Sequence, residues 1–380
     1  MSKLNRYQLP RLNGRQVQLF IADTCDLKCD GCPYPQQSPE IKKAIKDKEL
    51  NLTRWYKIID YFYNNNIRLF CIIGGEPVSY IGIEQIIANI TKYPDTFVLL
   101  STSGIHLLHN NKLRKAVGNV LTQTVNRQFK NSVVVSYDVL TSGEKLSVKN
   151  SRALKAQQGF DFIRVMKQEY KDKITYIANV MVTPFNLDSI PEMQEFLEKE
   201  GIYTNLCTQQ GKCFGAKKSI FNKKHIKMLK KVGVEMIKRK INKRLVVNSV
   251  AYLSQLSGII GMEKYHCWEE PYGNPVIDVG SDGTLRFCNW IGQNQKKGVP
   301  GISLKQLIDK KMSWAEYWRL SKRTTQKLCT GCSWSRRDRT ENMVSFNPDI
   351  FTNSELPNIN PQDTRLQNIW VEAQRSIMSW

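Results

Sequence analysis

The sequence predicts an α/β protein: a partial (β/α)6 barrel of the TIM type, followed by a small cysteine-rich domain. From residue 17 to about residue 210, short apolar runs alternate with amphipathic stretches of helical period. Near-continuous apolar strands separated by helices indicate a parallel sheet that is buried on both faces. Six such units in about 200 residues fit a partial barrel better than a complete eightfold one.

The apolar runs have strand length and end at glycine or polar residues. The predicted strands are 17–23, 68–75, 96–104, 132–138, 174–183 and 202–208. The predicted helices between them include 52–66, 82–91, 110–125, 151–170 and 189–201. Further along, Asp282-Gly283 marks a hairpin turn.

Chemistry-bearing residues follow several of these strands. Three cysteines come after the first strand, a Gly-Gly-Glu-Pro turn ends the second, and a Ser-Thr-Ser-Gly turn ends the third. In open α/β sheets, ligands bind outside the carboxyl ends of the strands. We therefore expect the active site at this edge.

Bulk composition indicates a globular protein that works among reduced thiols. The chain has 380 residues, 41% of them hydrophobic, and its start lacks the apolar core of a signal peptide. It has no apolar run long enough for a transmembrane helix. We expect a cytoplasmic protein, in which ten cysteines indicate metal or redox chemistry before disulfides.

The net charge of +22 is unevenly distributed. Half of it lies in segment 217–244, which carries twelve Lys or Arg and a single acid, Glu235. Apolar residues recur there at helical spacing. The segment is either a helix solvated on its basic side or a docking surface for RNA, an acidic peptide or an anionic membrane.

The loop after the first strand contains Cys25, Cys29 and Cys32 in a C-x3-C-x2-C pattern. A cubane iron–sulfur cluster normally takes four thiolates, so three leave one iron open to an exogenous ligand. A closed zinc site is the alternative, but it needs a fourth Cys or His, and none lies nearby in the sequence.

This loop, directly after the first strand of a β/α sheet, resembles the radical S-adenosylmethionine superfamily. The resemblance implies a [4Fe-4S] cluster whose open iron chelates S-adenosylmethionine, which is split to a 5′-deoxyadenosyl radical that abstracts a hydrogen atom. It also implies that other residues contact S-adenosylmethionine: Gly74, Gly75, Glu76, Pro77, Ser101, Thr102, Ser136, Arg152 and Asn179. Lys145 or Lys149 are alternatives to Arg152. Where the family usually has an aromatic residue before the third cysteine, this chain has Gly31.

A second cysteine set lies downstream: Cys267, Cys288, Cys329 and Cys332. Four thiolates hold either a closed cluster or a zinc ion. The spacing resembles the shortened SPASM, or twitch, extension of the same superfamily, which implies an auxiliary [4Fe-4S] cluster. The predicted boundaries are an N-terminal extension at 1–16, the core at 17–215, a basic connector at 216–262, the auxiliary domain at 263–345 and a tail at 346–380.

Cys207 and Cys213 follow the sixth strand and are candidate hydrogen-atom donors, or else unreactive thiols. The resemblance implies an enzyme that modifies a peptide or protein, with flavodoxin or ferredoxin as reductant. The short N-terminal extension argues against the leader-binding domain of many peptide maturases. The alternatives are a small-molecule alcohol dehydrogenase with a single auxiliary cluster, and RNA modification through the basic segment.

Overall fold

The computed structural model describes part of the chain in two compact units. The described residues are 16–27, 34, 37–94, 96–123, 130–137, 151–184, 186–208, 221–242, 245–248, 250–254, 256–257, 276–288 and 300–328. The first unit comprises Met1–Val134, Gln158–Ile174 and His266–Thr330, and the second comprises Val135–Gln157, Thr175–Tyr265 and Gly331–Trp380. Within the described residues, no helix is both long and apolar enough to cross a membrane.

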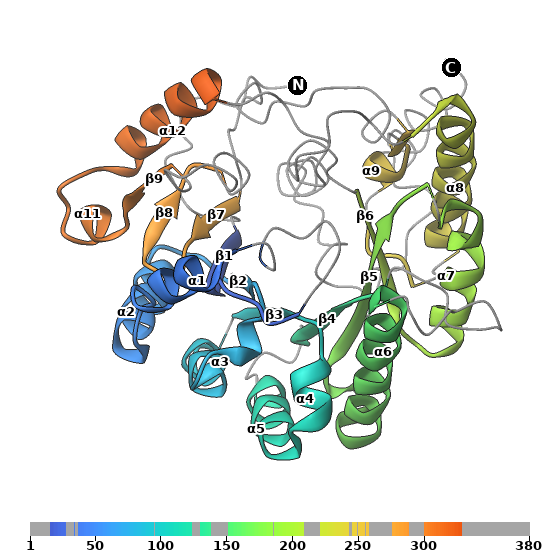
Figure 1. Cartoon of the computed structure of the whole chain (residues 1–380), viewed down its shortest axis with the longest axis horizontal. Helices are drawn as coiled ribbons and strands as arrows, with labels where there is room; N and C mark the ends of the chain where they lie inside the picture. Colours follow the sequence, from blue (N-terminus) through green and yellow to red (C-terminus); the bar gives the residue numbers. More distant parts are fainter. Residues whose placement is uncertain are drawn as a thin grey trace. The chain divides into compact units, whose positions relative to one another are not determined.

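The sheet of the first unit has the strand order β4-β3-β2-β1-β7-β8-β9, and the division between the units falls within β4, after Val134 (Figure 1). Its strands are β1 (Gln16–Ala22), β2 (Leu69–Gly74), β3 (Phe97–Thr102), β4 (Ser132–Ser136), β7 (Val276–Val279), β8 (Thr284–Arg286) and β9 (Gly301–Ser303). Strand β1 is parallel to both β2 and β7, whereas β8 is antiparallel to β7 and to β9. The C-terminal strands thus extend the sheet beyond β1.

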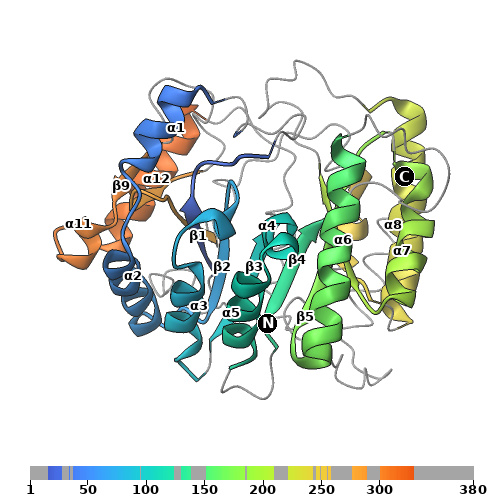
Figure 2. The same ribbon diagram turned by 60° about the horizontal axis from the view of Figure 1, so that its bottom comes forward.

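The first unit also contains helices, and those predicted at 52–66, 82–91, 110–125 and 151–170 are among them. They are α1 (Pro39–Lys46), α2 (Leu52–Asn64), α3 (Ile83–Thr91), α4 (Ile105–His109), α5 (Asn111–Thr122), α6 (Ser151–Tyr170), α11 (Lys305–Ile308) and α12 (Trp314–Leu328), with short 3-10 turns at Pro77–Ser79 and Lys171–Lys173. Helix α2 begins where the side chain of Asn51 accepts a hydrogen bond from the amide of Arg54, at 3.0 Å. Figure 2 shows α2, α3 and α5 along one face of β1 to β3.

The second unit contains β5 (Thr175–Val182) and β6 (Tyr203–Thr208), which pair in parallel. Its helices are α7 (Ile190–Lys199), α8 (Lys223–Ile241) and α9 (Val250–Ser254), and a 3-10 turn covers Leu187–Ser189. Along β5 and β6, buried residues alternate with half-exposed ones. One face of this strand pair is therefore packed, and the other is partly open.

Helix α8 contains most of the basic segment and packs by one side only. Its apolar side is buried through Leu229, Val232, Met236 and Ile237. Its exposed lysines are Lys223, Lys224, Lys227, Lys231 and Lys238. Between α7 and α8 lies a groove of about 530 Å³, where Arg239 pairs with Glu198 and Glu235. The exposed lysines form the basic side of the helix that the sequence predicts.

The predicted fold class is confirmed: the chain is a mixed α/β protein with parallel strands. All six predicted core strands are present, with ends within two residues of the predicted ones. The turn at Asp282-Gly283 joins β7 to β8, and Gly283 has a φ of 80°, which explains the glycine there. The predicted domain boundaries remain predictions.

Candidate functional site

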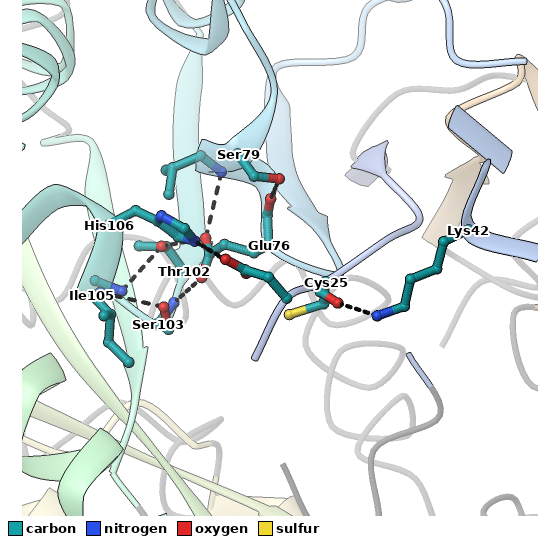
Figure 3. Close-up of polar contacts among 11 residues, drawn as sticks. Cys25, Lys42, Glu76, Ser79, Thr102, Ser103, Ile105 and His106 are labelled. Atoms are coloured by element: carbon teal, nitrogen blue, oxygen red, sulfur yellow. Dashed lines mark hydrogen bonds and ion pairs between the residues drawn. The ribbon is translucent and has the colours of Figure 1, made fainter. Parts of the chain in front are cut away.

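Cys25 lies three residues beyond the end of β1, at the carboxyl edge of the first unit's sheet. It is a buried, reduced thiol with 9% relative exposure. The ammonium of Lys42, on α1, donates a hydrogen bond to the carbonyl oxygen of Cys25 at 3.0 Å (Figure 3). Cys29 and Cys32 lie outside the described residues. Helix α1 therefore holds the backbone of Cys25, the one cysteine of the C-x3-C-x2-C loop that the structure describes.

The Gly-Gly-Glu-Pro turn at the end of β2 packs directly onto this segment. Gly74 has a φ of 150°, and a Cβ there would lie 2.1 Å from the carbonyl oxygen of Ala22. A Cβ on Gly75 would lie 2.0 Å from the carbonyl oxygen of Thr24 and 3.0 Å from the Cβ of Cys25. The amide of Gly75 also donates to the Ala22 carbonyl at 2.7 Å. Both glycines are needed for two backbones to meet beside the cysteine loop.

Glu76 joins the ends of β2 and β3. Its carboxylate accepts hydrogen bonds from the hydroxyl of Thr102 at 2.6 Å and from the amide of Ser103 at 2.9 Å (Figure 3). Glu76 is 1% exposed and Thr102 is 5% exposed. These two predicted ligand contacts therefore direct their side chains toward each other, while Ser101 on β3 is half-buried. Pro77, also buried, begins the 3-10 turn that follows.

Beside Cys25, a polar contact between two side chains spans the same edge. His106 on α4 lies with its Nε2 atom 3.1 Å from the carboxylate of Asp26. Figure 3 shows His106 near Thr102 and Ser103, beside the cysteine segment. The residues present fit an iron–sulfur cluster. Cys25 is a buried thiol at the carboxyl end of β1, and two further cysteines follow it within seven residues. Among the described residues, no three metal-binding side chains lie together.

The second unit contains other predicted contacts. Ser136 is exposed at the end of β4, and the amide of the next residue, Tyr137, donates to the Asn179 carbonyl at 2.9 Å. The Asn179 side chain accepts from Asn205 at 2.6 Å, and the Asn205 side chain accepts from Asn248 at 3.0 Å. The structure thus brings Ser136 and Asn179 together through adjacent strands. Arg152 lies in the first turn of α6, where the structure describes the backbone but not the arginine side chain.

Cys207 is half-buried on β6, opposite Met181 of β5. It is two residues from Asn205, so the two side chains lie on the same partly open face. Cys213 lies outside the described residues. The structure therefore places one of the two candidate hydrogen-atom donors on an accessible strand face.

Cys288 is the one described member of the second cysteine set, and it is buried, with 8% exposure, just after β8. Cys267, Cys329 and Cys332 lie outside the described residues. The hydroxyl of Tyr317 on α12 donates to the carbonyl of Arg286 at 3.0 Å, which fixes the backbone two residues before Cys288.

Sequence reasoning missed a buried ion pair in the first unit, between Arg286 and Asp23. Burial by itself lowers the pKa of Arg286, but the charge of Asp23 and its hydrogen bond, together with Tyr34 and Asp282, outweigh burial, so the pKa is raised above its ordinary value. Nearby, burial raises the pKa of Glu49, and the charge of Asp23 adds to that increase. The sequence feature that could have indicated this pair is Arg286 itself, a charged residue in the predicted hairpin that leads to Cys288.

Comparisons with known proteins agree with the predicted resemblance. No family model matches the chain. A curated relative, GTP 3′,8-cyclase 2 of Pseudomonas aeruginosa, is 28% identical over 109 residues, which is 28% of this chain and 32% of the relative. The chain therefore matches about a third of that relative's length.

Solved structures are similar over nearly the whole chain. Native anSMEcpe with bound AdoMet and the Cp18Cys peptide has a TM-score of 0.55 at 16% identity, covering 95% of this chain and 99% of the other. Native anSMEcpe with bound AdoMet alone has a TM-score of 0.54 at 16% identity, covering 96% of each chain. This relative is an anaerobic sulfatase-maturating radical S-adenosylmethionine enzyme of the SPASM type. The resemblance predicted from the sequence is confirmed, and the chain has the fold of a radical S-adenosylmethionine enzyme.

Proposed function

We propose that this chain is a radical S-adenosylmethionine enzyme that modifies a peptide or protein. The observation that carries the proposal is the position of Cys25, the first thiol of the C-x3-C-x2-C loop, at the carboxyl end of β1 with the Gly74-Gly75 turn packed against it. The shared fold and the cyclase relative support the same chemistry.

Cys25, Cys29 and Cys32 would hold a [4Fe-4S] cluster with one iron open to S-adenosylmethionine, and Cys267, Cys288, Cys329 and Cys332 would hold an auxiliary cluster. The first cluster, when bound, would supply the electron that splits the sulfonium of S-adenosylmethionine, and we propose flavodoxin or ferredoxin as its electron donor. Clusters bound by cysteine thiolates require a compartment in which thiols stay reduced, and we propose that the chain works in such a compartment.

The chain's own residues position the ligands of this site. Lys42 donates to the carbonyl of Cys25 and the amide of Gly75 donates to the carbonyl of Ala22, so the backbone that leads into the first cysteine is held in place. Glu76 fixes the strand ends beside it, which leaves the backbone of residues 74–77 and the half-buried Ser101 to meet S-adenosylmethionine. Ser136, Arg152 and Asn179 are proposed contacts for the rest of that molecule.

A peptide substrate is supported by the fold comparison, because two of the similar anSMEcpe structures hold peptides. Cys207 on the open face of β5 and β6 is then a proposed hydrogen-atom donor, together with Cys213. A thiol in that position would give its hydrogen atom to a substrate carbon radical, which leaves an epimerised product and a thiyl radical; one electron from the reductant and a proton would then restore the thiol.

Anaerobic reconstitution followed by product analysis tests the proposed function. The reduced wild-type chain is expected to convert S-adenosylmethionine to 5′-deoxyadenosine, and Cys25→Ala is expected to abolish this. Cys71→Ala, which removes a buried thiol on β2, is the matched control and keeps the activity. Unchanged cleavage in Cys25→Ala contradicts the proposal. Deuterium passed from labelled candidate peptides into 5′-deoxyadenosine then identifies the substrate.

RNA modification is the second candidate, favoured by the exposed lysines of α8. Neutralising several phosphates makes affinity fall steeply with salt. If the substrate is RNA, replacing Lys224, Lys227 and Lys231 by Gln reduces both the affinity and its salt dependence. If the substrate is a peptide or a neutral alcohol, the same replacements are expected to change the affinity for it little.

A further inference from the structure

Arg286 is a buried arginine in a pocket shaped for its side chain. It lies at the end of β8 with 9% side-chain exposure, and its guanidinium forms an ion pair with Asp23. The same guanidinium lies 4.7 Å from the ring centroid of Phe20 on β1. Gly280 leaves room for it, since a Cβ there would lie 2.5 Å from a guanidinium nitrogen. The site thus accommodates a long cationic side chain and supplies its charge partner.

The carboxylate of Asp23 has further partners from the same hairpin. One oxygen accepts hydrogen bonds from the amide of Ser281 at 3.1 Å and from its hydroxyl at 2.9 Å, besides the contact with Arg286. Asp23 is 13% exposed at its side chain. The turn between β7 and β8 is therefore fastened to the end of β1 by one buried carboxylate.

Each member of this pair lies two residues before a cysteine of one of the two sets. Asp23 stands two residues before Cys25, and Arg286 stands two residues before Cys288. The paired residues are 263 positions apart in the chain but lie in the same compact unit. Strand β7 also pairs with β1, so the hairpin and the cysteine loop share one sheet. A shift of either segment strains the other through the buried pair.

We propose that the Asp23–Arg286 pair couples the loading of the two cluster sites, so that a cluster held by one cysteine set favours binding at the other. Asp23 and Arg286 are positioning residues, and the inference rests on the proposed function. A largely buried charge that loses its partner is strongly unfavourable, because little water reaches it to replace the lost interaction. If the segment that carries Asp23 and Cys25 loses its order, the segment that carries Arg286 and Cys288 is therefore disturbed as well, and the reverse also holds.

The test is a cycle of variants read out by cluster binding rather than by turnover. Cys288→Ser disables the auxiliary site alone, and the first cluster is followed by the change that S-adenosylmethionine causes in its electron paramagnetic resonance signal. In the wild-type background, Cys288→Ser is expected to weaken retention of the first cluster against an iron chelator by about tenfold. In an Asp23→Asn/Arg286→Met background, the same change is expected to have no effect.

Single variants separate coupling from general stability. Arg286→Met is expected to weaken retention of both clusters, and Arg286→Lys, which keeps the charge, to restore much of it. Arg114→Met is the matched control, because it breaks another part-buried pair of the same unit, Arg114 with Glu169 at 3.0 Å. It is expected to lower the unfolding temperature without changing cluster retention.

Two outcomes would overturn the coupling while leaving the proposed function intact. In one, the wild-type chain binds both clusters and cleaves S-adenosylmethionine, yet Cys288→Ser leaves retention of the first cluster unchanged. In the other, Arg286→Met loses the auxiliary cluster alone. A wild-type chain that binds no iron after reconstitution overturns the coupling and the proposed function together.

Discussion

The hydroxyl of Thr102 donates a hydrogen bond to the carboxylate of Glu76 at 2.6 Å, and this contact joins the ends of β3 and β2. Both residues are almost fully buried. The contact explains why two polar residues that the sequence marks as ligand contacts are so well protected from solvent. Their side chains form the frame of the site, and the backbone around them faces the cysteine segment.

Glu76→Gln is expected to destabilise the fold and weaken S-adenosylmethionine binding. The amide nitrogen of Gln cannot accept the hydrogen bond that one of the two carboxylate oxygens now accepts, so a buried donor loses its partner, which costs about 1–3 kcal/mol. Chemical denaturation and equilibrium dialysis measure the two effects. Glu192→Gln, at an exposed position of α7, is the control. Equal stability in the two variants contradicts this role of Glu76.

Gly75→Ala is expected to impair cluster binding more than it impairs folding. The new Cβ would lie 2.0 Å from the Thr24 carbonyl oxygen, so the backbone next to Cys25 must move. Overpacking of this kind costs about 1–3 kcal/mol. Gly118→Ala, whose Cβ would meet the ring of Tyr170 at 2.2 Å, is the control with a comparable clash away from the cysteines. Iron content after reconstitution should fall only in Gly75→Ala.

Much of the fold follows from local sequence patterns. The six apolar runs predict the six core strands because each is near-continuous and ends at a turn residue. Helix α2 is similarly clear, with Trp55, Ile58, Ile59 and Phe62 all buried at helical spacing. The carboxyl-edge rule then predicts that Cys25 and the Gly74-Gly75 turn meet, and the structure confirms that contact.

Other features depend on contacts between distant segments, which local patterns do not contain. The close approach of both glycines to the backbone of residues 22–24 is one such contact, because the Gly-Gly pair alone does not show which segment it meets. The pairing of β7 with β1 and the ion pair of Arg286 with Asp23 join residues more than 250 positions apart. Helix α12 was also missed; its Trp314 and Tyr317 meet edge to face, with ring centroids 5.4 Å apart.

Cys207→Ala is expected to leave 5′-deoxyadenosine formation intact while changing the product made from a peptide substrate. The thiol lies on a strand face rather than in the cysteine loop, so cluster binding does not depend on it. Solvent deuterium incorporation at the modified carbon measures hydrogen return. Cys213→Ala is tested in parallel. An unchanged product in both variants excludes a donor role for these thiols.

Tyr93 provides a pH-dependent test of the first unit's packing. Burial, together with the hydrogen bond to Asp60 at 2.6 Å, raises the pKa of Tyr93 to about 12 from the ordinary 10.0. A raised folded-state pKa means that this contribution to stability is complete below pH 10.0 and is lost as pH rises toward about 12. Ultraviolet titration of the phenol should show Asp60→Asn lowering the midpoint, and Tyr93→Phe should remove that transition. A midpoint unchanged by Asp60→Asn contradicts the assigned cause.

The most direct test of the account asks whether S-adenosylmethionine binds an open iron of the cluster held by Cys25, Cys29 and Cys32. The measurement is pulsed electron paramagnetic resonance on the reduced cluster of Cys288→Ser, which isolates the first site, with S-adenosylmethionine labelled with ¹⁵N at its amino group. The account predicts a hyperfine coupling to the labelled nitrogen. A spectrum that is unchanged by the labelled compound, with every iron bound by protein side chains, would contradict it.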